Sequence, residues 1–109
     1  MSKFIDVNDS NFQKDVLEYA DTPVLVKFWA PWCGPCKVMT PIAEQVAAAR
    51  SDDDLRFVDI NVDEAVNVTQ ALSIRGVPTV MLFNKGQRVA AVTGGLNRQQ
   101  LEAFIDQHI

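Results

Sequence analysis

Apolar and polar residues along the chain follow the two periods that distinguish strands from helices. Apolar-rich runs of strand length occur at 24–29 and 55–62, and a shorter β-branched run follows at 79–83. A nearly continuous apolar run such as 24–29 is typical of a strand that is covered on both faces. A short edge strand at 3–7 and a last strand at 88–93 complete the predicted sheet.

Between these strands, the apolar residues recur at helical spacing instead. The first helical segment follows the candidate caps Asn8-Asp9-Ser10, with Gln13 three residues after Ser10, and ends near 21–23. The second runs from Cys36 to about Ala49 and contains Pro41. We expect the proline to bend this helix, because it lacks an N–H group and its ring crowds the preceding turn.

Two shorter helices and one hairpin turn complete the pattern. Residues 65–72, behind the candidate cap Asp63, predict a third helix, and Asn97 with Gln100 predicts the start of a fourth. Residues 84–87 are typical of a hairpin turn. The order β-α-β-α-β-α-β-β-α predicts an α/β three-layer sandwich, with a mixed central sheet of four to five strands flanked by four helices.

Length and composition indicate one soluble globular domain over residues 1–109, with 48% apolar and 22% charged residues. The net charge of −4 argues against a nucleic-acid binder. No window reaches the length of a membrane span, and the first residues lack the basic and apolar regions of a signal peptide. We therefore expect a cytoplasmic protein without a membrane partner.

Both cysteines lie in one segment, Trp32-Cys33-Gly34-Pro35-Cys36-Lys37, at a strand-to-helix junction. In a reducing compartment such a pair is more often catalytic or metal-binding than a permanent bridge. If Cys33 sits at the helix N-terminus, the free N–H groups and the helix dipole stabilise its thiolate and make it nucleophilic. Cys36, one turn further along, is then placed to attack a mixed disulfide on Cys33. The pattern favours a dithiol redox site.

Other interpretations of this segment remain open. A structural disulfide across so short a loop would contribute only about 2 kcal/mol to stability. A zinc site needs four ligands, and besides the two cysteines the chain offers only His108 near its end, so metal binding would require two paired chains. The chain could also be a non-catalytic binding subunit that uses the surface of Trp32 and Pro78.

The segment from Phe28 to Lys37 resembles the active-site segment of the thioredoxin family. A lone C-x-x-C is a weak signal, whereas W-C-G-P-C-K with a downstream V-P-T is specific. The resemblance extends through Pro41, Asp63, residues 75–79, Phe83, Gly86 and Gly94. It implies a protein-disulfide reductase whose redox-active group is the Cys33–Cys36 disulfide and which binds no cofactor. It also implies a monomer whose partners are disulfide-containing client proteins and thioredoxin reductase, a flavoprotein that carries FAD and uses NADPH.

The resemblance also predicts the surroundings of the two thiols. It implies that the Val77–Pro78 peptide bond is cis and lies against Cys33, whereas the residues alone would favour a trans bond. A small, mostly apolar surface of this kind binds extended partners without reading much of their sequence. The residues expected in this substrate-binding surface are Trp32, Gly34, Pro35, Gly76, Val77, Pro78 and Gly94.

One position departs from the family pattern. Lys27 stands inside the apolar run 24–29, where the family usually has a buried aspartate. A buried lysine must find an anion, reach solvent along its stem or lose its proton. Asp59 stands in the next predicted strand, where the family usually has a lysine, so we predict a pair of reversed sign and name both residues as candidate catalytic residues. The sequence leaves open whether the pair transfers the Cys36 proton or only stabilises the fold.

Overall fold

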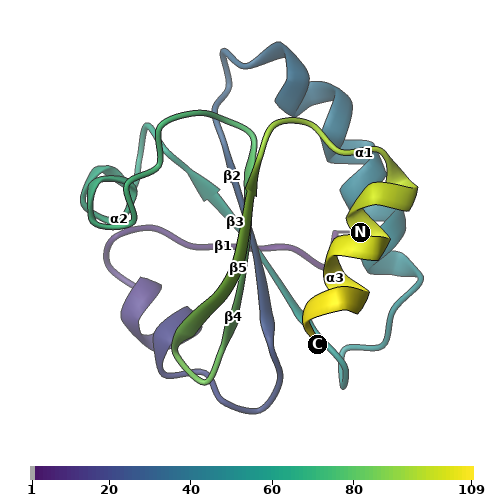
Figure 1. Cartoon of the computed structure of the whole chain (residues 1–109). Coiled ribbons are helices and arrows are strands. Elements are labelled where there is room, and N and C mark those ends of the chain that lie inside the picture. The colour runs from purple at the N-terminus through teal and green to yellow at the C-terminus, as the bar shows by residue number, and fades with distance from the viewer. Residues whose placement is uncertain (1) are drawn as a thin grey trace.

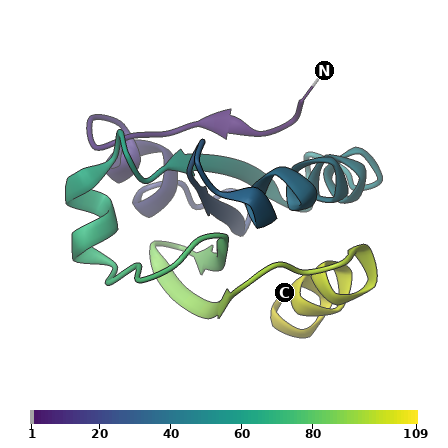
Figure 2. The ribbon, with the colours of Figure 1, turned by 90° about the horizontal axis from the view of Figure 1, so that it is seen from above.

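The computed structural model describes residues 2–109 and shows a mixed five-stranded sheet between two layers of helices (Figure 1). The strands are β1 (Ile5–Asp6), β2 (Val24–Trp29), β3 (Arg56–Asn61), β4 (Thr79–Asn84) and β5 (Gln87–Thr93). Their order across the sheet is β1-β3-β2-β4-β5, which places β1 and β5 at opposite edges (Figure 2). The first three are parallel, whereas β4 runs antiparallel to β2 and β5 antiparallel to β4. The predicted α/β sandwich is confirmed, with five strands.

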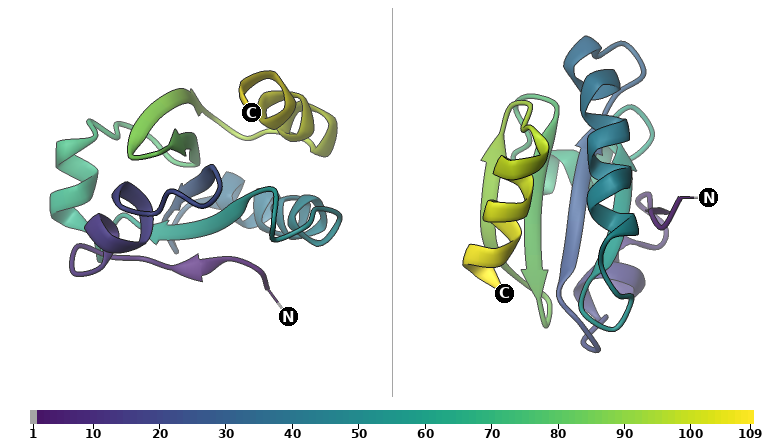
Figure 3. Two further views of the ribbon diagram at one scale, coloured as in Figure 1. Left: turned by 90° about the horizontal axis from the view of Figure 1, so that it is seen from below. Right: turned by 90° about the vertical axis from the view of Figure 1, so that its right-hand side faces the viewer.

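Four helical elements cover the two faces of this sheet. They are η1 (Gln13–Leu17), α1 (Gly34–Ala48), α2 (Val66–Ala71) and α3 (Arg98–His108). Helices α1 and α3 pack side by side on one face, as the right-hand view of Figure 3 shows, and η1 and α2 cover the other. The sheet is therefore buried on both faces, as the apolar runs predict.

Strand β2 contributes to both cores because successive side chains of a strand point to opposite faces. Val26 and Phe28 lie in the core on the side of η1 and α2, whereas Leu25 lies in the core under α1 and α3. Lys27 follows the period of Leu25, so it points toward α1 and away from the first core. Parallel pairing places Lys27 directly beside Asp59 of β3. The sequence thus directs a charged pair into the layer beneath α1.

The first helix differs from its prediction. It is a short π-helix whose N-cap, Phe12, makes no side-chain capping hydrogen bond, so the predicted cap of Ser10 with Gln13 is wrong. The reason is local: the backbone N–H and the hydroxyl of Ser10 both donate to the side chain of Asn8, at 2.9 and 2.6 Å. The Ser10 hydroxyl is engaged in this turn before the helix begins.

The prediction that Asp63 caps α2 is also wrong. The N-cap of α2 is Ala65, which makes no side-chain cap. The free N–H groups of the first turn donate instead to the carboxylate of Asp9, at 3.1 Å from Asn67 and 2.9 Å from Val68. A residue of the loop after β1 therefore caps a helix that lies far away in the sequence.

The cap of α3 and the turn between β4 and β5 agree with the sequence prediction. Asn97 and Gln100 form the predicted capping box of α3, with hydrogen bonds of 2.8 and 2.9 Å. The turn between β4 and β5 has positive φ at Lys85 (52°) and Gly86 (82°), which is the type I′ geometry of tight hairpins. A Cβ atom at Gly86 would lie 2.5 Å from the carbonyl oxygen of Leu17, so this position requires glycine on two grounds.

Candidate functional site

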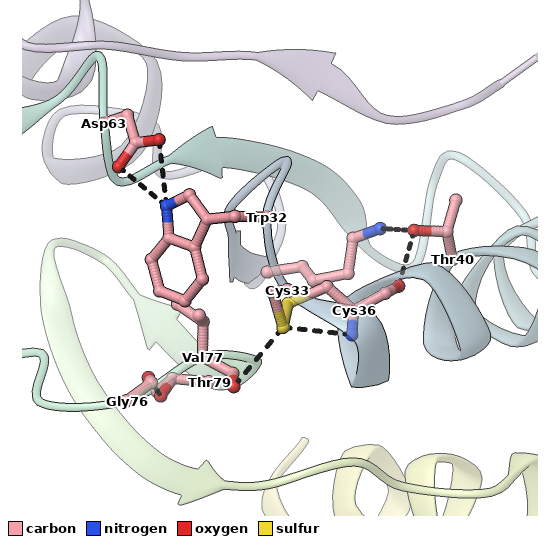
Figure 4. The surroundings of a disulfide bond; sticks show 9 residues. Trp32, Cys33, Cys36, Thr40, Asp63, Gly76, Val77 and Thr79 are labelled. Atoms are coloured by element: carbon pink, nitrogen blue, oxygen red, sulfur yellow. Dashed lines mark hydrogen bonds between the residues drawn. A yellow bond between two sulfur atoms is a disulfide. The ribbon is translucent and has the colours of Figure 1, made fainter.

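Cys33 and Cys36 lie where β2 passes into α1. Cys33 is the N-cap of α1, which begins at Gly34, two residues earlier than predicted. The two cysteines form a disulfide with their Cα atoms 5.3 Å apart. The backbone N–H of Cys36 donates to the Cys33 sulfur at 3.1 Å (Figure 4). Gly34 and Pro35 occupy the first turn, where the missing N–H of proline costs nothing. The Cys33 sulfur thus sits at the positive end of the helix dipole, where a thiolate is stabilised.

Trp32 stands beside the disulfide with 69% of its surface exposed, which is unusual for so large an apolar side chain. Its indole N–H points to the carboxylate of Asp63, at 3.1 and 3.3 Å from the two oxygens (Figure 4). This contact orients the ring while its face stays open to solvent. Asp63 thus acts on the surface beside the disulfide and not on α2.

The loop before β4 forms the opposite side of the site. The Val77–Pro78 peptide bond is cis, and the carbonyl oxygen of Val77 lies 3.6 Å from the Cys33 sulfur. Thr79 fixes this loop by donating its hydroxyl to the carbonyl of Gly76 at 2.6 Å. Gly94, directly after β5, is joined to this loop, because its N–H donates to the carbonyl of Pro78 at 2.8 Å. Val77 therefore contacts the disulfide directly, and hydrogen bonds of Gly76 and Gly94 hold the loop that carries it.

Lys27 and Asp59 lie next to each other beneath α1. The Lys27 ammonium is 3.3 Å from Oδ1 of Asp59, with side-chain exposures of 4% and 18%. The distance allows an ion pair, but Oδ1 is buried without a hydrogen-bond partner among residues 2–109. The ring of Phe4 covers the ammonium, 4.9 Å from its centroid.

Burial raises the pKa of Asp59 above its ordinary value, and the positive charge of Lys27 opposes this rise. The negative charges of Asp6 and Glu44 add smaller upward effects on the same pKa. Asp59 also lines a hollow of about 320 Å³ together with Trp29, Asn61 and Glu64. The carboxyl group is therefore the end of the pair that faces solvent, and Lys27 is the enclosed end.

Thr40, one helical turn after Cys36, was not identified from the sequence. Its hydroxyl oxygen lies 3.4 Å from the Lys27 ammonium and 2.9 Å from the carbonyl oxygen of Cys36. A threonine in a helix gives no signal of a site in the sequence, because threonines bond to the preceding turn in many helices. Only the placement of Lys27 beneath α1 makes Thr40 notable.

Comparisons with known proteins agree with this geometry. The family model for thioredoxin matches residues 3–107. The chain belongs to the thioredoxin family. It is 45% identical to the thioredoxin of Acidithiobacillus ferridurans, with 94% of each chain covered. It is 41% identical to thioredoxin 1 of Synechococcus elongatus over the full length of both chains. It is also 42% identical to the thioredoxin of Pseudomonas aeruginosa, with 96% of this chain and 95% of the relative covered.

Membership of this family makes the chain a thiol–disulfide oxidoreductase and a protein-disulfide reductase, with Cys33–Cys36 as its redox-active disulfide. Thioredoxins carry no bound cofactor. Within residues 2–109, no group of three or more His, Cys, Asp or Glu side chains is arranged to hold a metal ion. Nor does any described helix have the length and apolar character required to cross a membrane.

Proposed function

We propose that Cys33 is the attacking thiol and Cys36 the resolving thiol of this reductase. The hydrogen bond from the Cys36 N–H to the Cys33 sulfur, 3.1 Å long, carries the assignment. It stabilises negative charge on Cys33, and the helix dipole adds to this effect. The two cysteines are almost equally buried, at 4% and 3% exposure, so burial does not separate their roles. Cys36 lies one turn inside α1, within reach of a sulfur bound to Cys33, whereas Cys33 is the N-cap at the end of the helix.

Two exchange steps transfer the electrons. The Cys33 thiolate attacks one sulfur of the client disulfide, the client S–S bond breaks, and the released client sulfur takes up a proton. Cys36 then loses its proton and attacks Cys33, which breaks the mixed disulfide and forms the Cys33–Cys36 bond. The second client sulfur leaves and is protonated. Two electrons have then passed from the protein to the client. The client takes up two protons: one balances the proton that Cys36 loses, and the other comes from solvent, which received the Cys33 proton when the thiolate formed.

The client is proposed to lie on the surface formed by Trp32, Gly34, Pro35, Gly76, Val77, Pro78 and Gly94. An extended segment can meet exposed backbone groups on one side and apolar side chains on the other. A hollow of about 190 Å³ between Trp32 and Val77 offers room for one client side chain. The surface has few polar groups, which suits varied clients better than one fixed sequence.

Lys27 and Asp59 are proposed to act in the resolving step. The Lys27 cation beneath α1 favours the negative charge that Cys36 must develop when it attacks. Because its pKa is raised, Asp59 is a better proton acceptor than an exposed aspartate, and its hollow connects it with solvent. The reversed pair thereby supplies a stabilising charge at its enclosed end and a proton exchange site at its open end.

We further propose that the protein works as a monomeric domain of the cytoplasm and is recycled by a thioredoxin reductase, which alone binds NADPH and FAD. A dithiol that must be reduced again after each turnover fits a reducing compartment. Cell fractionation tests the location in the cytoplasm, and a coupled assay that follows NADPH oxidation tests the recycling. Recovery from an oxidising compartment, or no NADPH oxidation with any purified reductase, would contradict them.

Trapping experiments test the roles of the cysteines. Reduced Cys36→Ser should form a stable mixed disulfide with insulin, detected as a mass increase, because nothing resolves it. Cys33→Ser is the matched control and should trap far less. The reverse pattern would exchange the two roles. Absence of insulin reduction by the wild-type protein, with dithiothreitol as reductant, would overturn the function itself.

A further inference from the structure

The hydroxyl of Thr40 lies between the buried cation and the helix turn that carries the resolving cysteine. It is 2.9 Å from the carbonyl oxygen of Cys36 and 3.4 Å from the Lys27 nitrogen, and Figure 4 draws both contacts as dashed lines from Thr40. Cys36 and Thr40 are four residues apart in α1, so their side chains lie on the same side of the helix. This is the side that faces Lys27.

The chemistry of the three groups fixes the direction of these hydrogen bonds. An ammonium group has only donors and a backbone carbonyl only accepts, whereas a hydroxyl can do both. The Thr40 oxygen therefore accepts from Lys27, and its hydrogen is donated to the Cys36 carbonyl. Hydrogen bonds connected in this way polarise one another, which strengthens the link between the cation and the backbone of Cys36.

Few other groups hold the ammonium in place. The other contacts described for it are the ion pair with Asp59 and the ring of Phe4. Asp59 belongs to β3 and opens to the hollow on the side of Trp29 and Glu64. Without the Thr40 oxygen, none of the other contacts described for the ammonium would hold it against α1, and the carboxylate would draw the cation toward β3.

We propose that Thr40 is a positioning residue of the redox centre: it holds the Lys27 ammonium against the turn of Cys36 and thereby sets how strongly the buried cation favours the reduced dithiol. The inference rests on the proposed roles of Cys36 and Lys27. It adds a residue that touches neither client nor sulfur and acts only through the lysine. The ordinary role of a helical threonine, a bond to the preceding turn, does not require an ammonium at its oxygen.

The redox equilibrium with glutathione measures this effect. Thr40→Val keeps the shape of the side chain and removes the oxygen. The Lys27 ammonium should then move away from the turn of Cys36, and the equilibrium should shift from the reduced dithiol toward the disulfide. We expect a shift of roughly threefold to tenfold toward the disulfide, equal to a potential about 14–30 mV more negative. The matched control Thr40→Ser keeps the hydroxyl and should retain the wild-type potential.

The pH dependence separates this effect from a structural one. The cation acts on a thiolate, so Thr40→Val and the wild type should agree at acid pH, where both cysteines are thiols, and diverge as the pH rises. The other charged groups near Lys27 are its partner Asp59 on β3 and, around Asp59, Asp6 on β1 and Glu44 on α1, and all three remain in every variant. In a Lys27→Met background, Thr40→Val should cause no shift, because no cation is left to position.

Each outcome bears on one part of the proposal. A potential of Thr40→Val equal to that of the wild type at every pH, with normal insulin reduction, would refute the role of Thr40 and leave the reductase function intact. An equal shift in the Lys27→Met background would show that Thr40 acts without the lysine, which also refutes it. Failure of the wild-type protein to reduce insulin would instead refute the proposed function.

Discussion

Replacing Asp59 by asparagine should destabilise the fold more than replacing Lys27 by methionine, although each change removes the same ion pair. Two unit charges about 4 Å apart attract by about 4 kcal/mol at an effective dielectric constant near 20. What each variant loses depends on the charge that is left behind. Asp59→Asn leaves an ammonium that is 4% exposed, whereas Lys27→Met leaves a carboxyl group that is 18% exposed and lines a hollow.

The expected magnitudes follow from this asymmetry. Asp59→Asn should cost about 3 kcal/mol in the free energy of unfolding, because the enclosed cation then keeps only neutral neighbours, namely the Thr40 hydroxyl, the Phe4 ring and the new amide group. Lys27→Met should cost about 1 kcal/mol or less at pH 7, because Asp59 can take up a proton or meet water. The double variant should resemble Lys27→Met, since neither buried charge is then present.

The pH dependence of stability gives a second, independent check. A carboxyl group whose pKa is raised in the fold contributes stability that is present below its unfolded value of 3.8 and lost as the pH rises through the folded value. Lys27→Met removes the charge that opposes this rise, so the pKa of Asp59 should increase further. Relative to the wild type, Lys27→Met should therefore be most stable at acid pH and lose stability toward pH 7.

Guanidinium unfolding followed by far-UV circular dichroism, on the oxidised proteins at pH 4 and pH 7, measures these differences. The double variant supplies the coupling energy between the two sites. Additivity of the two single variants within about 0.5 kcal/mol would show that the charges are not coupled. A larger cost for Lys27→Met than for Asp59→Asn would refute the argument from burial.

Two features outside the site give further predictions. Gly86→Ala should destabilise the protein by more than about 1 kcal/mol, because the φ of Gly86 is positive and the new Cβ would meet Leu17. A thermal melt checks this. In the control Gly95→Ala a Cβ meets nothing within 4 Å, and an equal loss of stability there would contradict the prediction. Asp9→Ala should cost about 1 kcal/mol and speed amide exchange in α2. Asp63→Ala is its control, and faster exchange in α2 from that change would contradict the assignment of the cap.

The features that the sequence predicts well depend on local patterns. The apolar run of β2 and the capping box at Asn97 each lie within a few neighbouring residues, so the sequence alone predicts the strand and the start of the helix. The positions of Cys33 and Cys36 at the start of a helix are equally local. The pairing of Lys27 with Asp59 also follows once β2 and β3 are known to be parallel neighbours, because register fixes which side chains meet.

The features that the sequence does not reveal depend on contacts between distant segments. Asp9 and Asp63 both look like ordinary caps for the residues that follow them. In the structure Asp9 accepts from the first turn of α2 and Asp63 accepts from the indole N–H of Trp32, because only the folded chain brings these donors close. Thr40 is hidden for the same reason, since its partner Lys27 lies on a strand and not on its own helix.

The cap provided by Asp9 has a consequence for how the chain is made. Helix α2 has only six residues, too few to persist alone, and its first turn is tied to a loop that precedes it by 58 and 59 residues. During synthesis that loop leaves the ribosome well before α2 does. The Asp9 carboxylate has thus already left the ribosome when the N–H groups of α2 emerge. A chain shortened past Asp9 would lose order in α2, although the deletion does not include that helix.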